Sequence, residues 1–108
     1  MNSYLYVISR KDLSIEQQAV QATHAAIEYV YHHPNRPIDN HPTLVHLTVN
    51  NKWELEQLQH NIYVEHGIHC VPFYESYQDI GLTAISCLVD DRFRKMFSHL
   101  KLWTAKPS

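Results

Sequence analysis

The sequence predicts a small α/β protein, with a four-stranded mixed sheet and helices packed on its faces in the order β-α-β-α-β-β-α. Four short runs are rich in β-branched and aromatic residues, and two longer segments have helical spacing and caps. Each of these two segments follows a strand-like run, and such long crossovers join parallel strands. The short link between the last two strands allows an antiparallel pair.

The first helix is expected from Leu13 to Tyr31, directly after a buried strand at Ser3–Ser9. Ser14 is a good N-cap, and Gln17 stands three residues later as a capping box requires. Residues at helical spacing predict the stripe that packs on the sheet: Ile15, Ala19, Ala22, Ala26, Tyr29 and Val30. The opposite face carries amides, an imidazole and a carboxylate that suit recognition or proton transfer: Gln17, Gln21, His24 and Glu28.

The middle of the chain predicts a loop, a strand and a second helix. The segment His32–Pro42 is polar and rich in proline, which indicates a surface loop, and Thr43–Val49 alternates as a strand. Asn50 or Asn51 caps a helix at Lys52–Glu65, and Gly67 ends it. Its inward side chains are expected to be Trp53, Leu55, Leu58, Ile62 and Val64.

The last third predicts two strands and a short helix. Ile68–Glu75 is the third strand, and Pro72 indicates an edge position or a bulge within it. A loop at Ser76–Leu82 leads to the fourth strand at Thr83–Val89. Asp90 and Asp91 then cap a short helix that runs to about His99, before a closing LKLW.

Composition indicates one globular domain over residues 1–108, with 44% hydrophobic and 19% charged residues. Two glycines exclude a glycine-rich phosphate loop. With a net charge of −2, nucleic acid would need a local basic patch, and the C-terminal segment offers one: Arg92, Arg94, Lys95, Lys101 and Lys106. Basic residues on a solvated helix end are the alternative interpretation.

Cys70 and Cys87 lie in apolar runs and are expected to be buried free thiols in a reducing compartment. No signal-peptide pattern and no apolar run of about 20 residues appears, so a cytoplasmic protein without membrane contact is expected. The nine histidines follow no zinc-binding pattern, so neither a metal nor another cofactor is expected.

One group of side chains suits hydrolysis. His24 lies on the polar face of the first helix, Glu75 ends the third strand, and Asp79 and Thr83 follow it. Strand ends and the first helix can converge in a small α/β sheet, where such groups would orient a water molecule and accept its proton. In the alternative interpretation, His24 bonds a carbonyl while Glu75 and Asp79 face solvent.

Two stretches resemble the type-II peptidyl-tRNA hydrolases. They are RKDL at Arg10–Leu13 and QQAVQATHAAIEY at Gln17–Tyr29, where Gln21, His24, Ala25 and Ala26 match the family's helix motif directly. Later segments agree in order, so the similarity covers about residues 3–103. The resemblance implies a four-stranded mixed sheet flanked by helices and metal-independent cleavage of the ester between a peptide and the 3′ ribose of tRNA.

Roles follow from the resemblance residue by residue. It implies catalytic roles for His24 and Glu75 and places the family's threonine at Thr83. Together with the spacing argument above, the hypothesis is that Glu75 or Asp79 activates water with His24 positioning it, and that Gln17, Gln21, Thr83 and Lys11 contact the substrate. The partner would be tRNA, and a homodimer is compatible with the family.

The chain departs from the family pattern in two places. Gln17 and Gln18 stand where the family usually has a lysine, for which Lys11 would substitute, and ESYQDIG replaces the family's D-A-G-x-T-x loop. A binding or interaction module on the same fold, without catalysis, is therefore the alternative function.

Overall fold

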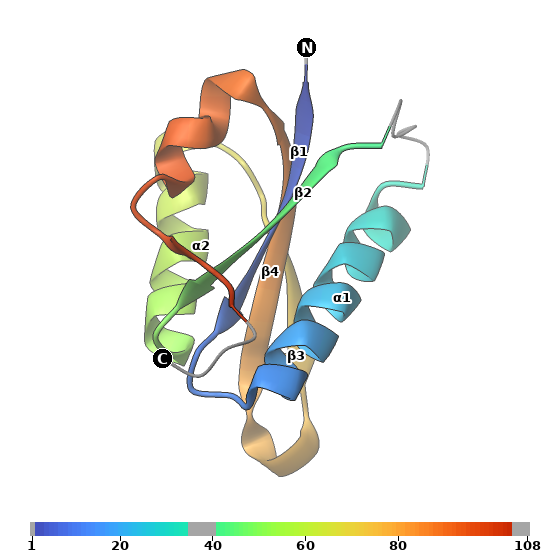
Figure 1. Cartoon of the computed structure of the whole chain (residues 1–108), viewed down its shortest axis with the longest axis vertical. Helices are drawn as coiled ribbons and strands as arrows, with labels where there is room; N and C mark the ends of the chain where they lie inside the picture. The colour runs from blue at the N-terminus through green and yellow to red at the C-terminus, as the bar shows by residue number, and fades with distance from the viewer. Residues whose placement is uncertain (1, 35–40, 105–108) are drawn as a thin grey trace.

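A five-stranded mixed sheet lies between two α-helices in the computed structural model, which describes residues 2–34 and 41–104 (Figure 1). The elements are β1 (Ser3–Arg10), α1 (Ile15–His32), β2 (Thr43–Val49), α2 (Lys52–His66), β3 (Val71–Glu75), the 3₁₀ turn η1 (Tyr77–Asp79), β4 (Gly81–Asp90), the 3₁₀ segment η2 (Asp91–Phe97) and β5 (Lys101–Leu102). The α/β class is confirmed. Part of the expected loop at 32–42 lies outside the described residues, and so does the basic residue at position 106.

The strands are ordered β3-β4-β1-β2-β5. β1 and β2 are parallel, while β4 is antiparallel to both β1 and β3, as the connection lengths predict. The prediction of four strands was wrong, because β5 adds a fifth that pairs antiparallel with β2 through Leu47 and Thr48. β5 has only two residues, which is too short to carry an alternating pattern.

The helices have the caps that the sequence predicts. The Ser14 hydroxyl accepts a hydrogen bond from the Gln17 amide, and the Asn51 side chain accepts one from the Glu54 amide. Gly67 ends α2 in the left-handed conformation, with φ of 68°. Both crossover helices therefore begin close to the carboxyl ends of the parallel strands β1 and β2.

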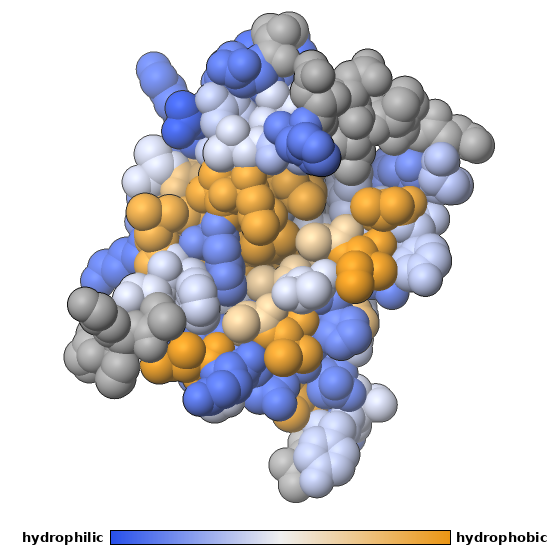
Figure 2. Space-filling view, turned by 45° about the vertical axis from the view of Figure 1, so that its right-hand side comes forward, coloured by the Kyte–Doolittle hydropathy of each residue, from blue (hydrophilic) through white to orange (hydrophobic). Residues whose placement is uncertain are grey.

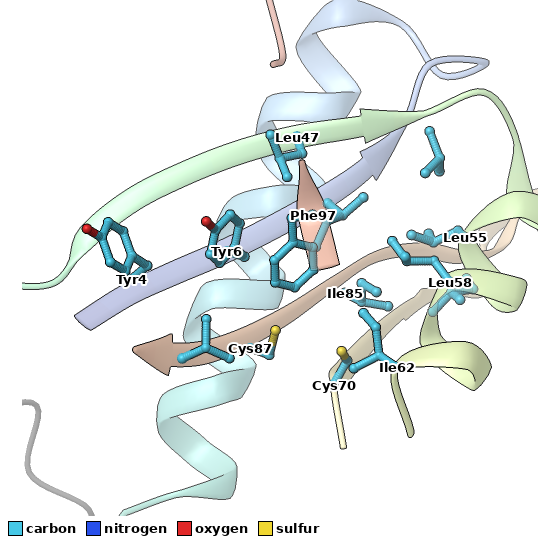
Figure 3. Packing of buried hydrophobic residues seen from close by; sticks show 14 residues of the cluster. Tyr4, Tyr6, Leu47, Leu55, Leu58, Ile62, Cys70, Ile85, Cys87 and Phe97 are labelled. Atoms are coloured by element: carbon cyan, nitrogen blue, oxygen red, sulfur yellow. The ribbon is translucent and has the colours of Figure 1, made fainter. Parts of the chain in front are cut away.

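The main core lies between the sheet, α2 and η2, where buried side chains of all three elements meet (Figure 3). Phe97 of η2 stacks on Tyr6 of β1 with ring centroids 4.1 Å apart. Cys70 and Cys87 are buried in this core as free thiols, as predicted. Trp53 was predicted to face inward, but 66% of it is exposed, and Val64 is also exposed.

α1 packs on the other face of the sheet, and the predicted stripe was right at Ala22 and Tyr29 but wrong at Val30, which is exposed. Its buried residues are Gln18, Gln21, Ala22, Ala25 and Tyr29. Two polar residues are tolerated there because the preceding turn and the sheet offer partners: the Gln18 amide donates to the Leu13 carbonyl oxygen at 2.8 Å, and the Thr83 hydroxyl donates to Oε1 of Gln21 at 3.1 Å. The helix therefore presents a mixed polar and small-residue face to the sheet.

Apolar side chains of α1 consequently face outward. Val30 is 52% exposed, and other large apolar side chains on α1 and β2 are also exposed: Val20, Ile27 and Leu44. Figure 2 shows apolar surface on this side of the molecule. Among the described residues, no helix is long and apolar enough to cross a membrane.

Candidate functional site

The end of the sheet where β1 and β3 finish brings several predicted site residues together. β3 runs parallel to β1 because both are antiparallel to β4, so Glu75 lies at the same end of the sheet as Arg10. α1 starts at this end, and its contacts with β3 and β4 place Gln21 and His24 over the two strands. The site therefore lies at carboxyl ends of strands, as is common in α/β sheets.

A bulge in the β3–β4 pair aims Thr83 at α1. Phe73 pairs with Ala84 and Tyr74 with Leu82, so Thr83 is the extra residue of β4. Its hydroxyl lies 3.1 Å from both the Phe73 carbonyl oxygen and Oε1 of Gln21. Thr83 is fully buried, so its hydroxyl positions neighbouring groups and has no direct access to solvent.

Gln21 extends this network toward the surface. Its side-chain amide donates to Oε1 of Gln17 at 3.1 Å, while Gln21 itself is 3% exposed. Gln17, one turn earlier on α1, is exposed. Of the two glutamines, only Gln17 is accessible to a ligand from solvent. The buried Gln21 positions the Gln17 side chain through a hydrogen bond, and Thr83 in turn positions Gln21.

His24 lies flat on Phe73. The two rings are 4.5 Å apart between centroids and 6° from parallel, which fixes the plane of the exposed imidazole. Phe73 and Glu75 are two residues apart on β3, so their side chains leave the same face of the strand. His24 therefore stacks on Phe73, and Glu75 is the next residue of β3 whose side chain leaves the same face of the strand.

The two carboxylates are less constrained. Oε1 of Glu75 accepts a hydrogen bond from the Tyr77 amide at 3.3 Å, and Asp79 is exposed in η1 with φ of 55°. Within residues 2–34 and 41–104, no hydrogen bond joins His24, Glu75 and Asp79 to one another. The three groups share one corner of the sheet without forming a preassembled triad.

Lys11 does not lie with these groups. Its amide donates to the Val49 carbonyl oxygen at 2.8 Å, and its side chain lines a separate cleft with Trp53 and Glu54 of α2. Hydrogen bonds from Asn50 lower the pKa of Glu54, and the nearby Lys11 charge lowers it further.

Lys52 is a basic residue of this corner that the sequence did not single out. A Cβ placed on Gly81 would lie 3.1 Å from Cε and 3.5 Å from Nζ of Lys52, and Gly81 is the register partner of Glu75. Gly81 has φ of 79°, so this close approach occurs at a backbone position suited to glycine. The position of Lys52, directly after β2 in the first turn of α2, was the signal available in the sequence.

Arg10 is a second residue that sequence reasoning left without a role. Its guanidinium donates to both carboxylate oxygens of Asp12 at 2.8 and 2.9 Å, and to the carbonyl oxygens of Ile80 and Leu82. Arg10 is 8% exposed. It therefore ties the turn after β1 to the start of β4 and fixes the corner around Gly81.

A Ser–His pair lies elsewhere on the α1 side of the sheet. Oγ of Ser9 is 2.7 Å from Nε2 of His46, and the His46 ring stacks on Trp103 at 4.9 Å. Burial lowers the pKa of His46 to about 4, so the ring is neutral near pH 7. Ser9 is fully buried, which excludes it as a nucleophile in this conformation and makes the pair part of the packing.

The described residues contain no group of three or more His, Cys, Asp and Glu side chains placed to hold a metal ion. The expected basic patch is only partly available. Arg92 pairs with Asp90 at 2.8 Å, and Arg94 lies over the Tyr4 ring at 4.5 Å, which leaves Lys95 and Lys101.

Comparisons with known proteins bear on the fold. No family model matches the chain, and no curated protein matches it in sequence. The chain is similar to the solved structure of Atu0240, a protein of unknown function from Agrobacterium tumefaciens strain C58, with a TM-score of 0.68 and 14% sequence identity. The match covers 96% of this chain and 99% of the other. The chain thus shares its fold with that protein.

Proposed function

We propose that the protein hydrolyses the ester bond of peptidyl-tRNA or a related acyl-tRNA without a metal ion. The observation that carries this proposal is the placement of His24 on Phe73, beside the face of β3 that carries Glu75. An imidazole of fixed plane near a carboxylate can orient a water molecule and accept its proton. The sequence resemblance to the type-II peptidyl-tRNA hydrolases supports the choice of substrate.

In the proposed reaction, Glu75 accepts a proton from a water molecule that His24 positions. The water oxygen forms a bond to the ester carbonyl carbon, and the bond from that carbon to the ribose 3′ oxygen then breaks. The 3′ oxygen receives the proton from Glu75, which gives a free 3′ hydroxyl and a peptide carboxylic acid; the acid then releases the second proton of the water molecule to solvent and becomes a carboxylate. Asp79 is the second candidate for the base, since it lies in the turn that follows Glu75.

Lys52 is the proposed cation of this site. The family's helix lysine is absent here, and Lys11 lies in another cleft, whereas Lys52 lies close to Gly81, which is the register partner of Glu75. An ammonium group in this corner would stabilise the oxyanion or a phosphate of the substrate, a contact worth about 10²-fold or more in rate. Gln17 would contact the substrate, held in place by Gln21 and Thr83.

The test is single-turnover release of peptide from an N-blocked aminoacyl-tRNA in the presence of EDTA. Release is expected from the wild type, and Glu75→Gln should lower its rate by about 10²-fold or more. The matched control is Glu56→Gln, which neutralises an exposed carboxylate on α2 and should leave the rate unchanged. Equal rates for Glu75→Gln and the wild type would reject Glu75 as the base.

A binding module on the same fold is the second candidate function. It is favoured by the absence of hydrogen bonds among His24, Glu75 and Asp79 within the described residues. A protein of this kind would release no peptide at any enzyme concentration. Its binding to tRNA, if electrostatic, would weaken as salt rises, whereas a complex with a protein partner would survive moderate salt.

A further inference from the structure

A polar groove runs along α2 on the side of the sheet away from α1. One part, of about 390 Å³, lies among Lys11, Trp53 and Lys101, and the next, of about 520 Å³, lies among His66, Lys95 and Phe93. The two parts share the side chains of Leu58, Asn61 and His99, so they are continuous. We call this surface the α2 groove.

Trp53 is an exposed aromatic platform at one end of the α2 groove. It lies in the first turn of α2, and 66% of its surface is open to solvent. Among the described residues its indole stacks on no other aromatic ring, in contrast to Trp103, which stacks on His46. A large flat apolar ring left in this position is suited to stacking against a planar ligand.

The charges along the α2 groove are mainly positive. Lys11, Lys95 and Lys101 form no salt bridge within residues 2–34 and 41–104. Two acidic side chains also line the groove: Glu54 at the Trp53 end, whose carboxylate oxygens accept hydrogen bonds from Asn50 at 2.8 and 3.1 Å, and Glu65 at the other end, which lies 3.9 Å from His66. The groove therefore has three lysines that form no salt bridge among the described residues, and it also contains the aromatic platform.

We propose that the α2 groove binds unpaired RNA, with one base stacked on Trp53 and backbone phosphates paired with Lys11, Lys95 and Lys101. A positive groove that follows the backbone, combined with an aromatic ring for a base, is the usual way in which proteins hold single strands. The amides of Asn50 and Asn61 line the same groove and can bond base edges.

The identity of the RNA rests on the function proposed above: in a hydrolase of acyl-tRNA, it is the unpaired 3′ end of the substrate. Lys11 supplies the link between the two surfaces. It lies in the turn that joins β1 to α1, so the α2 groove opens at the same end of the sheet as His24 and Glu75. An RNA strand that leaves the α2 groove at Lys11 would therefore reach the end of the sheet where His24 and Glu75 lie.

The test is fluorescence anisotropy with a labelled unpaired RNA of about eight nucleotides, a length within the span of known single-strand sites. Trp53→Ala should weaken binding by about 5- to 150-fold, the range measured when one stacking aromatic is removed. Tyr31→Ala is the matched control, since Tyr31 is an aromatic residue of α1 that is 74% exposed, and it should bind as the wild type does. Circular dichroism would check that both variants fold.

Salt dependence tests the phosphate contacts separately. Affinity should fall between about 50 and 200 mM salt, and Lys101→Gln should reduce the slope of log affinity against log salt by about 0.7. Binding of Trp53→Ala equal to that of the wild type would overturn the proposal. The proposal would also be overturned if the wild type bound an oligoglutamate peptide but did not bind the RNA at low salt.

The two proposals fail in distinguishable ways. The oligonucleotide carries no acyl ester, so its binding is measured independently of hydrolysis. RNA binding without peptide release from the tRNA substrate would reject the hydrolase proposal and leave the α2 groove proposal standing. If Trp53→Ala released peptide with an unchanged KM, the proposal that the α2 groove binds RNA would be rejected and the hydrolase proposal would stand.

Discussion

The Thr83 hydroxyl of β4 lies 3.1 Å from Oε1 of Gln21 on α1, inside the interface between the helix and the sheet. Both residues are almost completely buried. The bond therefore joins two elements that are far apart in the sequence, and it holds the helix face from which Gln17 and His24 reach the surface.

Thr83→Val should lower the free energy of unfolding by about 1–3 kcal/mol. Valine keeps the volume of the side chain, but Oε1 of Gln21 loses a buried hydrogen-bond donor. The measurement is urea unfolding followed by far-UV circular dichroism. Thr23→Val is the control, because the exposed Thr23 bonds only the Ala19 carbonyl of its own helix and its loss should cost less than about 0.5 kcal/mol. Equal effects of the two substitutions would contradict this role of Thr83.

Arg10→Lys should destabilise the fold by about 2 kcal/mol. Lysine retains the charge, but it cannot reproduce the planar fork that binds Asp12 and two carbonyl oxygens of the β4 entry. Arg92→Lys is the matched control, since Arg92 also binds a carboxylate through two nitrogens but is exposed; its loss should cost at most about 1 kcal/mol. Chemical denaturation of both variants would give the comparison, and a larger loss in Arg92→Lys would contradict it.

Mild acidification should lower the free energy of unfolding through the protonation of His46. Its pKa is lowered from 6.5 to about 4 by burial, so the unfolded chain binds more protons than the folded chain between these values. The contribution is fully present above pH 6.5 and is lost as the pH falls toward 4. Allowing for the part of the ring that is exposed, we expect about 1–2 kcal/mol.

The measurement for His46 is urea unfolding at pH 7 and pH 4.5. The wild type should lose more stability between the two values than His46→Gln, because glutamine does not titrate and the other histidines are common to both proteins. Parallel losses in the two proteins would show that His46 makes no contribution.

Cys70 and Cys87 should resist thiol reagents in the folded protein. A hydrogen bond with Cys70 and burial together raise the pKa of Cys87 well above its usual value, so its reactive thiolate is scarce. With a disulfide reagent at pH 8, labelling should proceed only at the rate of unfolding and become rapid in urea. Rapid stoichiometric labelling of the native protein would contradict the burial of both thiols.

Most of the fold could be predicted because local signals agreed with the final packing. The caps at Ser14 and Asn51, the alternation in β2 and the left-handed Gly67 that ends α2 depend only on neighbouring residues. Pro72 correctly indicated an edge strand with an irregularity, since β3 lies at the edge of the sheet and its pairing shifts after Phe73.

The burial of two glutamines on α1 could not be predicted from hydrophobicity. Gln18 is buried because its amide donates to the Leu13 carbonyl oxygen, and Gln21 is buried because Thr83 reaches it from β4. These partners appear only after folding, while Val20 and Val30 remain at the surface. The same limit applies to the site, because Lys52 lies close to Gly81 although no local pattern relates the two residues.

The central claim is that His24 and Glu75 act on one water molecule, and a double-mutant cycle tests it most directly. Single-turnover peptide release would be measured for the wild type, His24→Ala, Glu75→Gln and the double variant, with folding checked by circular dichroism. We predict that each single substitution lowers the rate by about 10²-fold or more, and that the double variant is no slower than the slower single variant, because the two groups serve one step. Rates equal to the wild type in both single variants, or effects that multiply in the double variant, would contradict the claim.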